Sequence, residues 1–467
     1  MLNESAERGL RSMSARTVND NDANNDTSDT SDMSDATSNN TNTAAPKRVL
    51  IVSETSMAQT NGVSGSIRHI LRRFTERDID AYLITPQPAP DDGTVEGFLV
   101  DTVPSWPIQR FYVAIPRKTS VIRSITELAE SGWRPDIIHV AAPISKLGHA
   151  ALIAGHRLHI PTVAIYQTDV AQYARRFARQ AVGTITDGLA DGIDDAEISL
   201  LGDSLRKPRH AKWLRRISRA AGEQAEQIVA QRIAQMHNKA TLTLAPTEQA
   251  RQRLEEFGVD PKLIQLWGRG VDSTLFTPTR RDGEHARQLH ETWSHGGTLP
   301  VVGYVGRLAP EKQVERLTVL DGLGMQLVVV GGGPSEDALR ELLPHAIFTG
   351  MLHGDALADA YAALDLFVHT GAEETFGQTI QEAMASGLPV VAPASGGPLD
   401  LVDDGRTGLL FDPSDDETLY ECVARLLADE SLRRAMGEAG LAAVQGRTWP
   451  ALVDQLIDHY YRLVMRR

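Results

Sequence analysis

The sequence predicts an α/β protein with two doubly wound, Rossmann-like domains that follow a disordered N-terminal tail. Short apolar runs alternate with helical patterns, and this alternation occurs twice along the chain. The runs are continuously apolar, as expected for parallel strands that are covered on both faces. Ligands bind beyond the carboxyl ends of such strands, so we expect the chemistry in loops that face a cleft between the domains.

The strand candidates fall into two series. Those of the first domain are residues 47–54, 80–86, 136–143, 162–168 and 240–247. Those of the second domain are residues 300–307, 326–333, 345–350, 364–371 and 389–396. We therefore place the first domain at residues 46–275 and the second at residues 276–448.

Two segments lie outside this alternation. Residues 1–45 form the tail, whose part rich in Asn, Asp, Ser and Thr cannot bury enough apolar surface to offset its ordering entropy. We interpret residues 178–239 as a long helical insertion in the first domain. The insertion contains a basic segment with the cations Arg206, Lys207, Arg209, Lys212, Arg215, Arg216 and Arg219. This basic segment is either a solvated helix face or a contact with anionic lipid or a charged acceptor.

The composition limits the classes of partner and compartment. The 467 residues suffice for two or three domains, and the formal charge of −14 argues against nucleic acid, because phosphate binding requires a basic surface. A single cysteine, Cys422, rules out an intrachain disulfide and a cysteine metal cluster, as expected in a reducing compartment. The chain has neither an apolar run of about 20 residues nor an apolar signal segment. We expect it in the cytoplasm or peripherally at the inner face of the plasma membrane.

The loop QTNGVSGSIR, residues 59–68, lies between the first apolar run and a helical pattern. Gly62 and Gly65 would let the backbone approach a ligand closely, and a helix N-terminus offers N–H groups to an anion. The loop is therefore either a phosphate-facing loop or a simple strand-to-helix turn.

The segment VGRLAPEK, residues 305–312, carries two cations directly after an apolar run. Arg307 offers a planar fork and Lys312 a point charge, and both suit a pyrophosphate at the carboxyl end of a parallel strand. The alternative is a surface turn with two solvated cations.

The segment VVVGGGPSE, residues 328–336, has three glycines after an apolar run. It lacks the third glycine of a dinucleotide-binding fingerprint at the required spacing. We interpret it as a turn in which backbone segments pack closely.

The segment EETFGQTIQE, residues 373–382, contains two glutamates around the predicted start of a helix over residues 377–385. Phe376 and Gly377 lie where the first helical N–H groups have no intrahelical partner. Carboxylates accept hydrogen bonds from vicinal hydroxyls, so Glu374 and Glu382 suit a sugar or a ribose. The alternative is that the acidic groups only complement the helix dipole, which fits Glu373 and Glu374 but not Glu382.

Histidines and carboxylates elsewhere show no spacing typical of metal ligands, and no Asp-x-Asp follows a strand candidate in the first domain. We therefore expect no metal site and no cofactor.

The second domain resembles a known family. In order, VGRLAPEK, VVVGGGP and HTGAEETFGQTIQEAMASGLPVVAPASGGPLDLVDDGRTGLLFDP resemble the donor-binding domain of the retaining family-4 glycosyltransferases, which have the GT-B fold. First-domain segments such as NGVSGSIRHI and YQTDVAQYARRF match more loosely. Together they resemble the GDP-mannose-dependent α-mannosyltransferases of actinobacterial lipoglycan assembly. The resemblance also implies a last helix, residues 449–467, that crosses back to the first domain.

The resemblance implies roles for the residues that match. Arg307 and Lys312 would clamp the pyrophosphate, and Glu374 would contact hydroxyls of the transferred sugar. The other donor-binding positions that it implies are Gly62 and Gly377 near the phosphates, Phe376 at the sugar and phosphate, Glu382 at the ribose, and Met351 and Leu352 at the base.

The sequence departs from the family after the run at residues 162–168. Many members have a histidine there that faces the transferred sugar, whereas this chain has Gln167, Thr168 and Asp169. Which of the three faces the sugar or the acceptor stays open. The insertion at residues 178–239 lies where acceptor contacts are expected.

The function implied is transfer of a hexose, with mannose from GDP-mannose favoured, onto a lipid-linked or glycan acceptor. Retention would follow from attack on the same face as the departing diphosphate, which would help to take the acceptor's proton. The alternatives are a glycosyltransferase that uses a UDP-sugar and a sugar-nucleotide-binding protein without catalysis.

Overall fold

The computed structural model describes residues 46–466, apart from residues 60, 109–110, 144 and 180–207. The predicted tail therefore lies outside the described residues. The chain divides into two compact units. Unit 1 comprises Met1–Ile165, Met236–Thr243 and Leu456–Arg467, and unit 2 comprises Tyr166–Gln235 and Leu244–Gln455. The domain boundary predicted between residues 275 and 276 stays a prediction.

Unit 1 contains six strands of a mainly parallel sheet, in the order β8-β7-β1-β2-β4-β3. These strands are β1 (Arg48–Ser53), β2 (Asp80–Pro86), β3 (Thr94–Val95), β4 (Phe98–Val103), β7 (Ile137–Ala141) and β8 (Thr162–Ile165). The hairpin of β5 (Ser105–Ile108) and β6 (Phe111–Ala114) follows β4. The helices are α2 (Gly62–Glu76), α3 (Lys118–Glu130) and α4 (Lys146–Leu158). Strand order reverses between β1 and β7, as expected for a doubly wound sheet.

The last helix, α16 (Trp449–Met465), belongs to unit 1 from Leu456 onward. Tyr460 is fully buried there and makes an edge-to-face contact with Phe74 of α2. The Tyr460 hydroxyl lies 2.5 Å from Nδ1 of His139 in β7. Burial lowers the pKa of His139 to about 3, so this histidine is a neutral core residue.

Unit 2 contains a parallel sheet with the order β13-β12-β11-β14-β15-β16. Its strands are β11 (Val301–Val305), β12 (Gln326–Val330), β13 (Ile347–Gly350), β14 (Leu366–Val368), β15 (Val390–Pro393) and β16 (Gly408–Phe411). Its helices are α9 (Glu284–Trp293), α10 (Glu336–Leu342), α11 (Gly354–Ala362), α12 (Gln378–Ala385), α13 (Pro398–Leu401), α14 (Asp416–Ala428) and α15 (Glu430–Val444).

The continuous apolar runs of this sheet serve two hydrophobic cores. Alternate residues of β11 belong to different cores: Val301 and Val305 to one, Val302 and Tyr304 to the other. Successive side chains of a strand point to opposite faces, so a strand covered on both faces must be apolar throughout.

Each of the ten predicted runs contains a strand, including β9 (Leu242–Ala245). The prediction missed the short β3, β4, the β5–β6 hairpin, β16 and the short β10 (Ile264–Leu266). Asp101 interrupts the apolar pattern of β4, and Pro107 interrupts that of β5. Strands this short or interrupted carry too little periodicity to be recognised.

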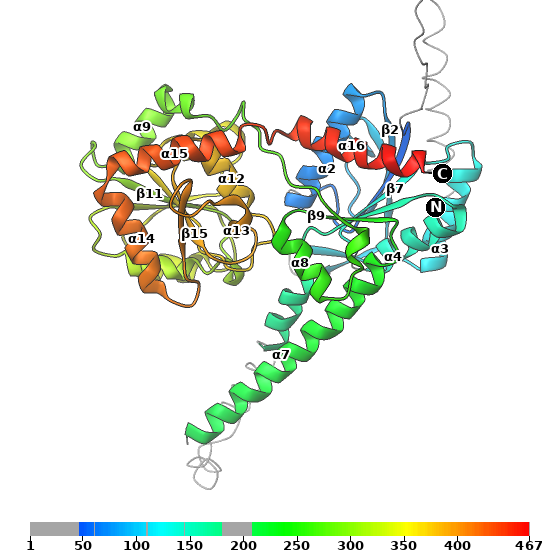
Figure 1. The fold of residues 1–467 in the computed structure, drawn as a ribbon, viewed down its shortest axis with the longest axis horizontal. Coiled ribbons are helices and arrows are strands. Elements are labelled where there is room, and N and C mark those ends of the chain that lie inside the picture. The colour runs from blue at the N-terminus through cyan, green and yellow to red at the C-terminus, as the bar shows by residue number, and fades with distance from the viewer. Residues whose placement is uncertain (1–45, 60, 109–110, 144, 180–207, 467) are drawn as a thin grey trace, which may run out of the picture. The chain divides into compact units, whose positions relative to one another are not determined.

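The segment predicted as a helical insertion contains α7 (Pro208–His237), a helix of 30 residues (Figure 1). In the basic segment, Arg206 and Lys207 lie outside the described residues, and so do the side chains of α7 before Ala220. The α8 helix (Glu248–Glu256) follows β9. In the part of the chain that the structure describes, no helix is both long and apolar enough to span a bilayer.

Candidate functional site

The carboxyl ends of β11 and β14 form the centre of the candidate site. The two strands are hydrogen-bonded neighbours, with Val302 opposite Leu366. From β11 the chain proceeds to β12 and β13 on one side, whereas β14, β15 and β16 follow on the other. A crevice forms where the strand order reverses in this way, and ligands bind there in open α/β sheets.

Lys312 and Glu374 meet at this point although they are far apart in the sequence. The loop after β11 carries Lys312, the loop after β14 carries Glu374, and the Lys312 Nζ atom lies 2.5 Å from Glu374 Oε2. Burial by itself disfavours both charges, but the pair compensates: the pKa of Glu374 is lowered and the pKa of Lys312 is raised. The pair is therefore ionised, which contradicts the alternative of a solvated Lys312.

The two loops are also joined through their backbones. The Thr370 hydroxyl donates a hydrogen bond of 2.6 Å to the carbonyl of Lys312. A Cβ atom on Gly371 would lie 3.3 Å from Lys312 Cα, which is tighter than most contacts of this kind. The position of the Lys312 side chain is therefore set by close packing of the loops.

Arg307 lies in a second charge network next to this pair. Its guanidinium is 3.7 Å from the Glu311 carboxylate. Glu311 also lies 3.4 Å from the guanidinium of Arg176, which forms an ion pair with Glu373 as well. The cations predicted to bind a diphosphate are thus already neutralised by carboxylates, and Glu373, which had no expected role, has a partner.

Glu382 lies on α12 in a different environment. The helix begins after Gly377, whose φ of +101° is a conformation that favours glycine. Burial raises the pKa of Glu382 to about 7, and hydrogen bonds from Tyr361 and Gln378 offset this only partly. The Tyr361 hydroxyl donates to Glu382 Oε2 at 3.1 Å. Glu382 is therefore not a charge on a solvated helix face.

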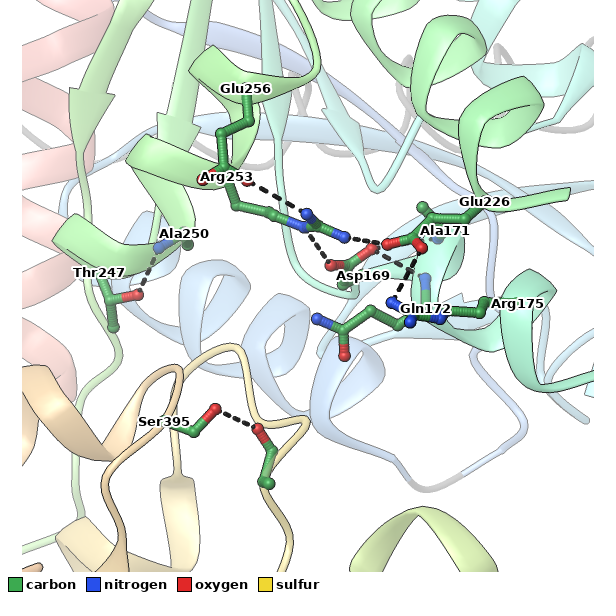
Figure 2. Close-up of polar contacts among 11 residues, drawn as sticks. Asp169, Ala171, Gln172, Arg175, Glu226, Thr247, Ala250, Arg253, Glu256 and Ser395 are labelled. Atoms are coloured by element: carbon green, nitrogen blue, oxygen red, sulfur yellow. Dashed lines mark hydrogen bonds and ion pairs between the residues drawn. The ribbon is translucent and has the colours of Figure 1, made fainter. Parts of the chain in front are cut away.

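Two glycines after β15 support the loop that carries Glu374. A Cβ atom on Gly396 would lie 2.4 Å from the Glu374 carbonyl oxygen, and one on Gly397 would lie 2.3 Å from that of Phe376. The Gly397 N–H donates to the Glu374 carbonyl at 2.7 Å. The Ser395 hydroxyl, labelled in Figure 2, donates to the Ala372 carbonyl at 2.9 Å. No side chain larger than hydrogen fits at Gly396 or Gly397 without displacing this loop.

The glycines of GGGPSE pack in the same close manner. A Cβ atom on Gly331 would lie 1.8 Å from the Gly306 carbonyl oxygen, and one on Gly333 would lie 2.1 Å from that of Leu308. The interpretation of this segment as a closely packed turn is confirmed.

A pocket of about 580 Å³ adjoins Glu374 within unit 2. Its lining is dominated by arginines, carboxylates and glutamines and includes Asp169, Gln172, Arg175, Arg176, Arg179, Glu226, Gln249, Gln252, Arg253, Glu256, Glu373 and Glu374. Figure 2 shows Arg253 between Asp169 and Glu226, with bonds to both. Four arginines and five carboxylates nearly balance in charge, and the pocket offers many hydrogen-bonding groups.

The three residues after β8 have different positions. Asp169 accepts hydrogen bonds from the N–H groups of Ala171 and Gln172 at the start of the helical residues 170–179, and it lines the pocket. The side chain of Gln167 accepts a hydrogen bond from Arg269, and its carbonyl accepts one from Thr375. Thr168 is half-buried.

The remaining predicted positions lie in both units. Gly62 begins α2 in unit 1, where the Asn61 side chain already accepts hydrogen bonds from Val63 and Ser64 N–H groups. Met351 follows β13 and is 56% exposed, whereas Leu352 packs against a core. Phe376 is buried in the same core.

Sequence reasoning did not identify several residues of this site. They are His369, Arg176, Glu311, Arg253, Tyr361, Gly396 and Gly397. His369 could have been noticed as a polar residue at the end of an apolar run, but the partners of Arg176 and Tyr361 come from distant segments. Within the described residues, no cluster of three or more His, Cys, Asp or Glu could hold a metal ion.

Comparison with known proteins identifies the family. Residues 286–442 match the family model described as "Glycosyl transferases group 1", and residues 60–275 match "Glycosyltransferase Family 4". A "GDP-mannose-dependent alpha-mannosyltransferase" of Mycolicibacterium smegmatis is 39% identical over 432 residues, which cover 90% of this chain and 98% of that protein. The chain belongs to the family-4 glycosyltransferases. A Corynebacterium glutamicum protein of the same name is 37% identical and covers 89% of each chain.

The fold of this glycosyltransferase is of the GT-B class. The crystal structure of Anabaena HepE in complex with UDP-glucose is similar, with a TM-score of 0.64. It covers 89% of this chain and 99% of the HepE chain at 17% sequence identity. The predicted fold class and the predicted family are both confirmed.

Proposed function

We propose that this glycosyltransferase transfers mannose from GDP-mannose to a glycan or lipid-linked acceptor with retention of the anomeric configuration. The donor is supported by the names of its relatives, which match almost the whole chain. In the structure, the observation that carries the proposal is the partly buried Lys312–Glu374 pair at the strand-order reversal of the unit 2 sheet. This pair offers a cation for a phosphate and a carboxylate for a hydroxyl at one point.

The donor's diphosphate binds Arg307 and Lys312. Both side chains now contact carboxylates, so donor binding replaces Glu311 and Glu374 as their partners with phosphate oxygens. The N–H groups near Phe376 and Gly377 add donors at the start of α12. Gly62 is a further donor-binding position, and Met351 and Leu352 flank the base.

Hydroxyl groups of the donor bind the two glutamates. Glu374 accepts hydrogen bonds from the transferred sugar, since its pKa is lowered and it is ionised at neutral pH. Glu382 accepts hydrogen bonds from the ribose. Neither acts as a nucleophile or a general acid across the scissile bond, because both belong to the donor-binding side of the site.

Catalysis consists mainly of charge stabilisation and orientation. As the bond to the diphosphate breaks, Arg307 and Lys312 stabilise the charge that develops on the leaving group. The acceptor hydroxyl attacks from the same face, and the departing diphosphate takes its proton. Holding donor and acceptor together supplies the remaining part of the rate enhancement.

The pocket beside Glu374 binds the acceptor. Its balanced arginines and carboxylates and its glutamines provide many hydrogen-bonding groups without a large net charge, which suits a polyhydroxylated glycan. A lipid-linked acceptor would bring the chain, from the cytoplasmic side, into peripheral contact with an anionic membrane. The basic segment at residues 206–219 is the sequence feature that fits such a contact.

The test is a panel of GDP- and UDP-sugars with the purified full-length chain. A ligand at 100 times its Kd stabilises the folded state by about 2.7 kcal/mol, so GDP-mannose should raise the melting temperature most. Slow hydrolysis of GDP-mannose to α-mannose, seen by NMR before mutarotation, would support retention. Stabilisation by UDP-sugars alone would contradict the proposed donor, and stabilisation without any turnover would favour a non-catalytic protein.

A further inference from the structure

His369 is a buried histidine next to the Lys312–Glu374 pair. It directly follows β14 and is only 2% exposed. Neither ring nitrogen has a hydrogen-bond partner of good geometry in the part of the chain that the structure describes. Buried polar groups are nearly always paired, so an imidazole left in this state calls for a functional explanation.

The imidazole is neutral in this environment. Burial and, to a smaller extent, the charge of Lys312 lower the pKa of His369 to about 4, while Glu374 and the Gly371 backbone act in the opposite direction. A neutral imidazole has one N–H donor and one acceptor nitrogen. His369 can therefore donate one hydrogen bond at neutral pH.

One acceptor is almost within reach of that donor. His369 Nε2 lies 3.8 Å from Glu374 Oε2, which is too far for a hydrogen bond. The same oxygen is held by Lys312 Nζ at 2.5 Å. Lys312 and His369 thus approach the same carboxylate oxygen, and in this structure Lys312 is the residue that binds it.

Donor binding changes this competition. In the function proposed above, Lys312 moves its charge toward the diphosphate, and Glu374 Oε2 then loses its strongest partner. The Glu374 side chain is only 19% exposed, and a partly buried carboxylate is more stable when a hydrogen-bond donor remains beside it. The Phe376 N–H remains near the carboxylate, and His369 is a further donor on the side from which Lys312 departs.

We propose that His369 is a positioning residue that replaces Lys312 as the partner of Glu374 Oε2 when the donor's diphosphate engages Lys312. This inference rests on the proposed function. His369 does not touch the donor in this role. It keeps the Glu374 carboxylate aimed at the transferred sugar while Lys312 serves the leaving group, so the two tasks do not compete.

The test compares two substitutions of His369. His369→Gln keeps an N–H donor at a similar distance from the main chain, whereas His369→Leu fills the same space without a hydrogen-bond donor. We expect His369→Leu to lower kcat with GDP-mannose about 10-fold, the effect of losing roughly one hydrogen bond in the transition state. His369→Gln should recover most of this loss, to within about threefold of the wild type. Both variants should bind GDP as the wild type does, by calorimetry, since GDP has no sugar for Glu374 to hold.

The outcomes separate this inference from the proposed function. Turnover of GDP-mannose by the wild type tests the proposed function. If the enzyme uses another nucleotide-sugar, the two His369 variants can be compared with that donor instead. Wild-type kcat in His369→Leu, or equal losses in the two variants, would overturn the role of His369 and leave the function intact. Equal melting temperatures in the two variants would show that a kcat difference does not come from folding.

A spectroscopic readout adds a measurement that a purely structural histidine would not change. In protein with 15N-labelled histidine, the His369 signal is assigned by its loss in His369→Gln. Lys312→Met removes the competing cation, so the pKa of His369 should rise without any ligand and its Nε2 should be protonated. An unchanged His369 signal in Lys312→Met would contradict the exchange of partners.

Discussion

Glu374 and Glu382 belong to one short motif, yet the structure gives them opposite electrostatic environments. Burial acts on both, but the charge of Lys312 and the Phe376 N–H more than compensate at Glu374, whose pKa is lowered. Burial raises the pKa of Glu382 to about 7, because the groups that offset burial there, Tyr361 and Gln378, carry no charge. Identical side chains eight positions apart therefore differ in charge near neutral pH, because a cation from another strand reaches only one of them.

The largest effect is expected from removing the cation that distinguishes the two sites. Lys312→Ala should lower kcat about 100-fold or more, the size of losing one preorganised charge-stabilising group. It should also lower the free energy of unfolding, because the partly buried Glu374 carboxylate loses its cation. The double variant Lys312→Ala/Glu374→Gln should regain stability but not activity. Near-wild-type turnover in Lys312→Ala, measured in steady-state assays, would rule out its proposed role.

The next effect comes from displacing the loop of Glu374 without touching Glu382. Gly396 has φ +61° and a Cβ there would lie 2.4 Å from the Glu374 carbonyl, whereas Gly405 has φ +78° and no atom within 4 Å among the described residues. Both alanine variants strain the backbone, but Gly396→Ala must also move the loop, at a cost of about 1–3 kcal/mol. We expect a lower kcat/KM and a lower midpoint of urea unfolding in Gly396→Ala than in Gly405→Ala. Equal effects would contradict the packing argument.

A smaller effect concerns the titration of Glu382. Its pKa is raised to about 7 in the folded protein, above the value of about 4.3 for an unfolded glutamate. The stability that the protonated form provides is therefore present at low pH and is lost as the pH rises through about 7. Glu382→Gln should be more stable than the wild type at pH 8, with a difference that vanishes toward pH 4. Urea unfolding at both pH values measures this.

The same titration should affect nucleotide binding. An ionised Glu382 accepts ribose hydrogen bonds better than a neutral carboxyl, so GDP affinity should increase as the pH rises through about 7. The phosphate groups of GDP also titrate. Glu382→Gln is the matched control, because the GDP affinity of this variant should change with pH only through the phosphate groups. Superimposable curves of calorimetric Kd against pH for the two proteins would contradict the ribose role.

The smallest effect is expected from the arginines of residues 170–179. Arg176 pairs with Glu311 and Glu373 beside the donor loops, whereas Arg175 pairs with Glu226 on α7. Partly exposed ion pairs contribute up to about 1 kcal/mol, so Arg176→Ala should lower kcat/KM about fivefold. Arg175→Ala should have less effect on the donor and serves as the control. A larger effect of Arg175→Ala on the KM for GDP-mannose would show that the Glu311 and Glu373 contacts do not matter.

Sequence reasoning found the elements of this site but not the contacts between them. The apolar runs predicted β11 and β14, and Arg307, Lys312 and Glu374 were recognisable because cations and carboxylates follow those runs directly. His369 and Arg176 were not recognised, because nothing in their local sequence shows which carboxylate each of them faces. Their significance depends on Glu374 and Glu311, which are contributed by other segments.

The sequence by itself determined the two series of strands, the family and the residue types available for a nucleotide-sugar. These follow from local information: apolar runs that must be covered on both faces, and motifs whose spacing is fixed along the chain. Only the tertiary structure decided the charge of each glutamate. Strand order makes β11 and β14 neighbours, so Lys312 reaches Glu374 and not Glu382, and a pKa depends on charges close in space rather than in sequence.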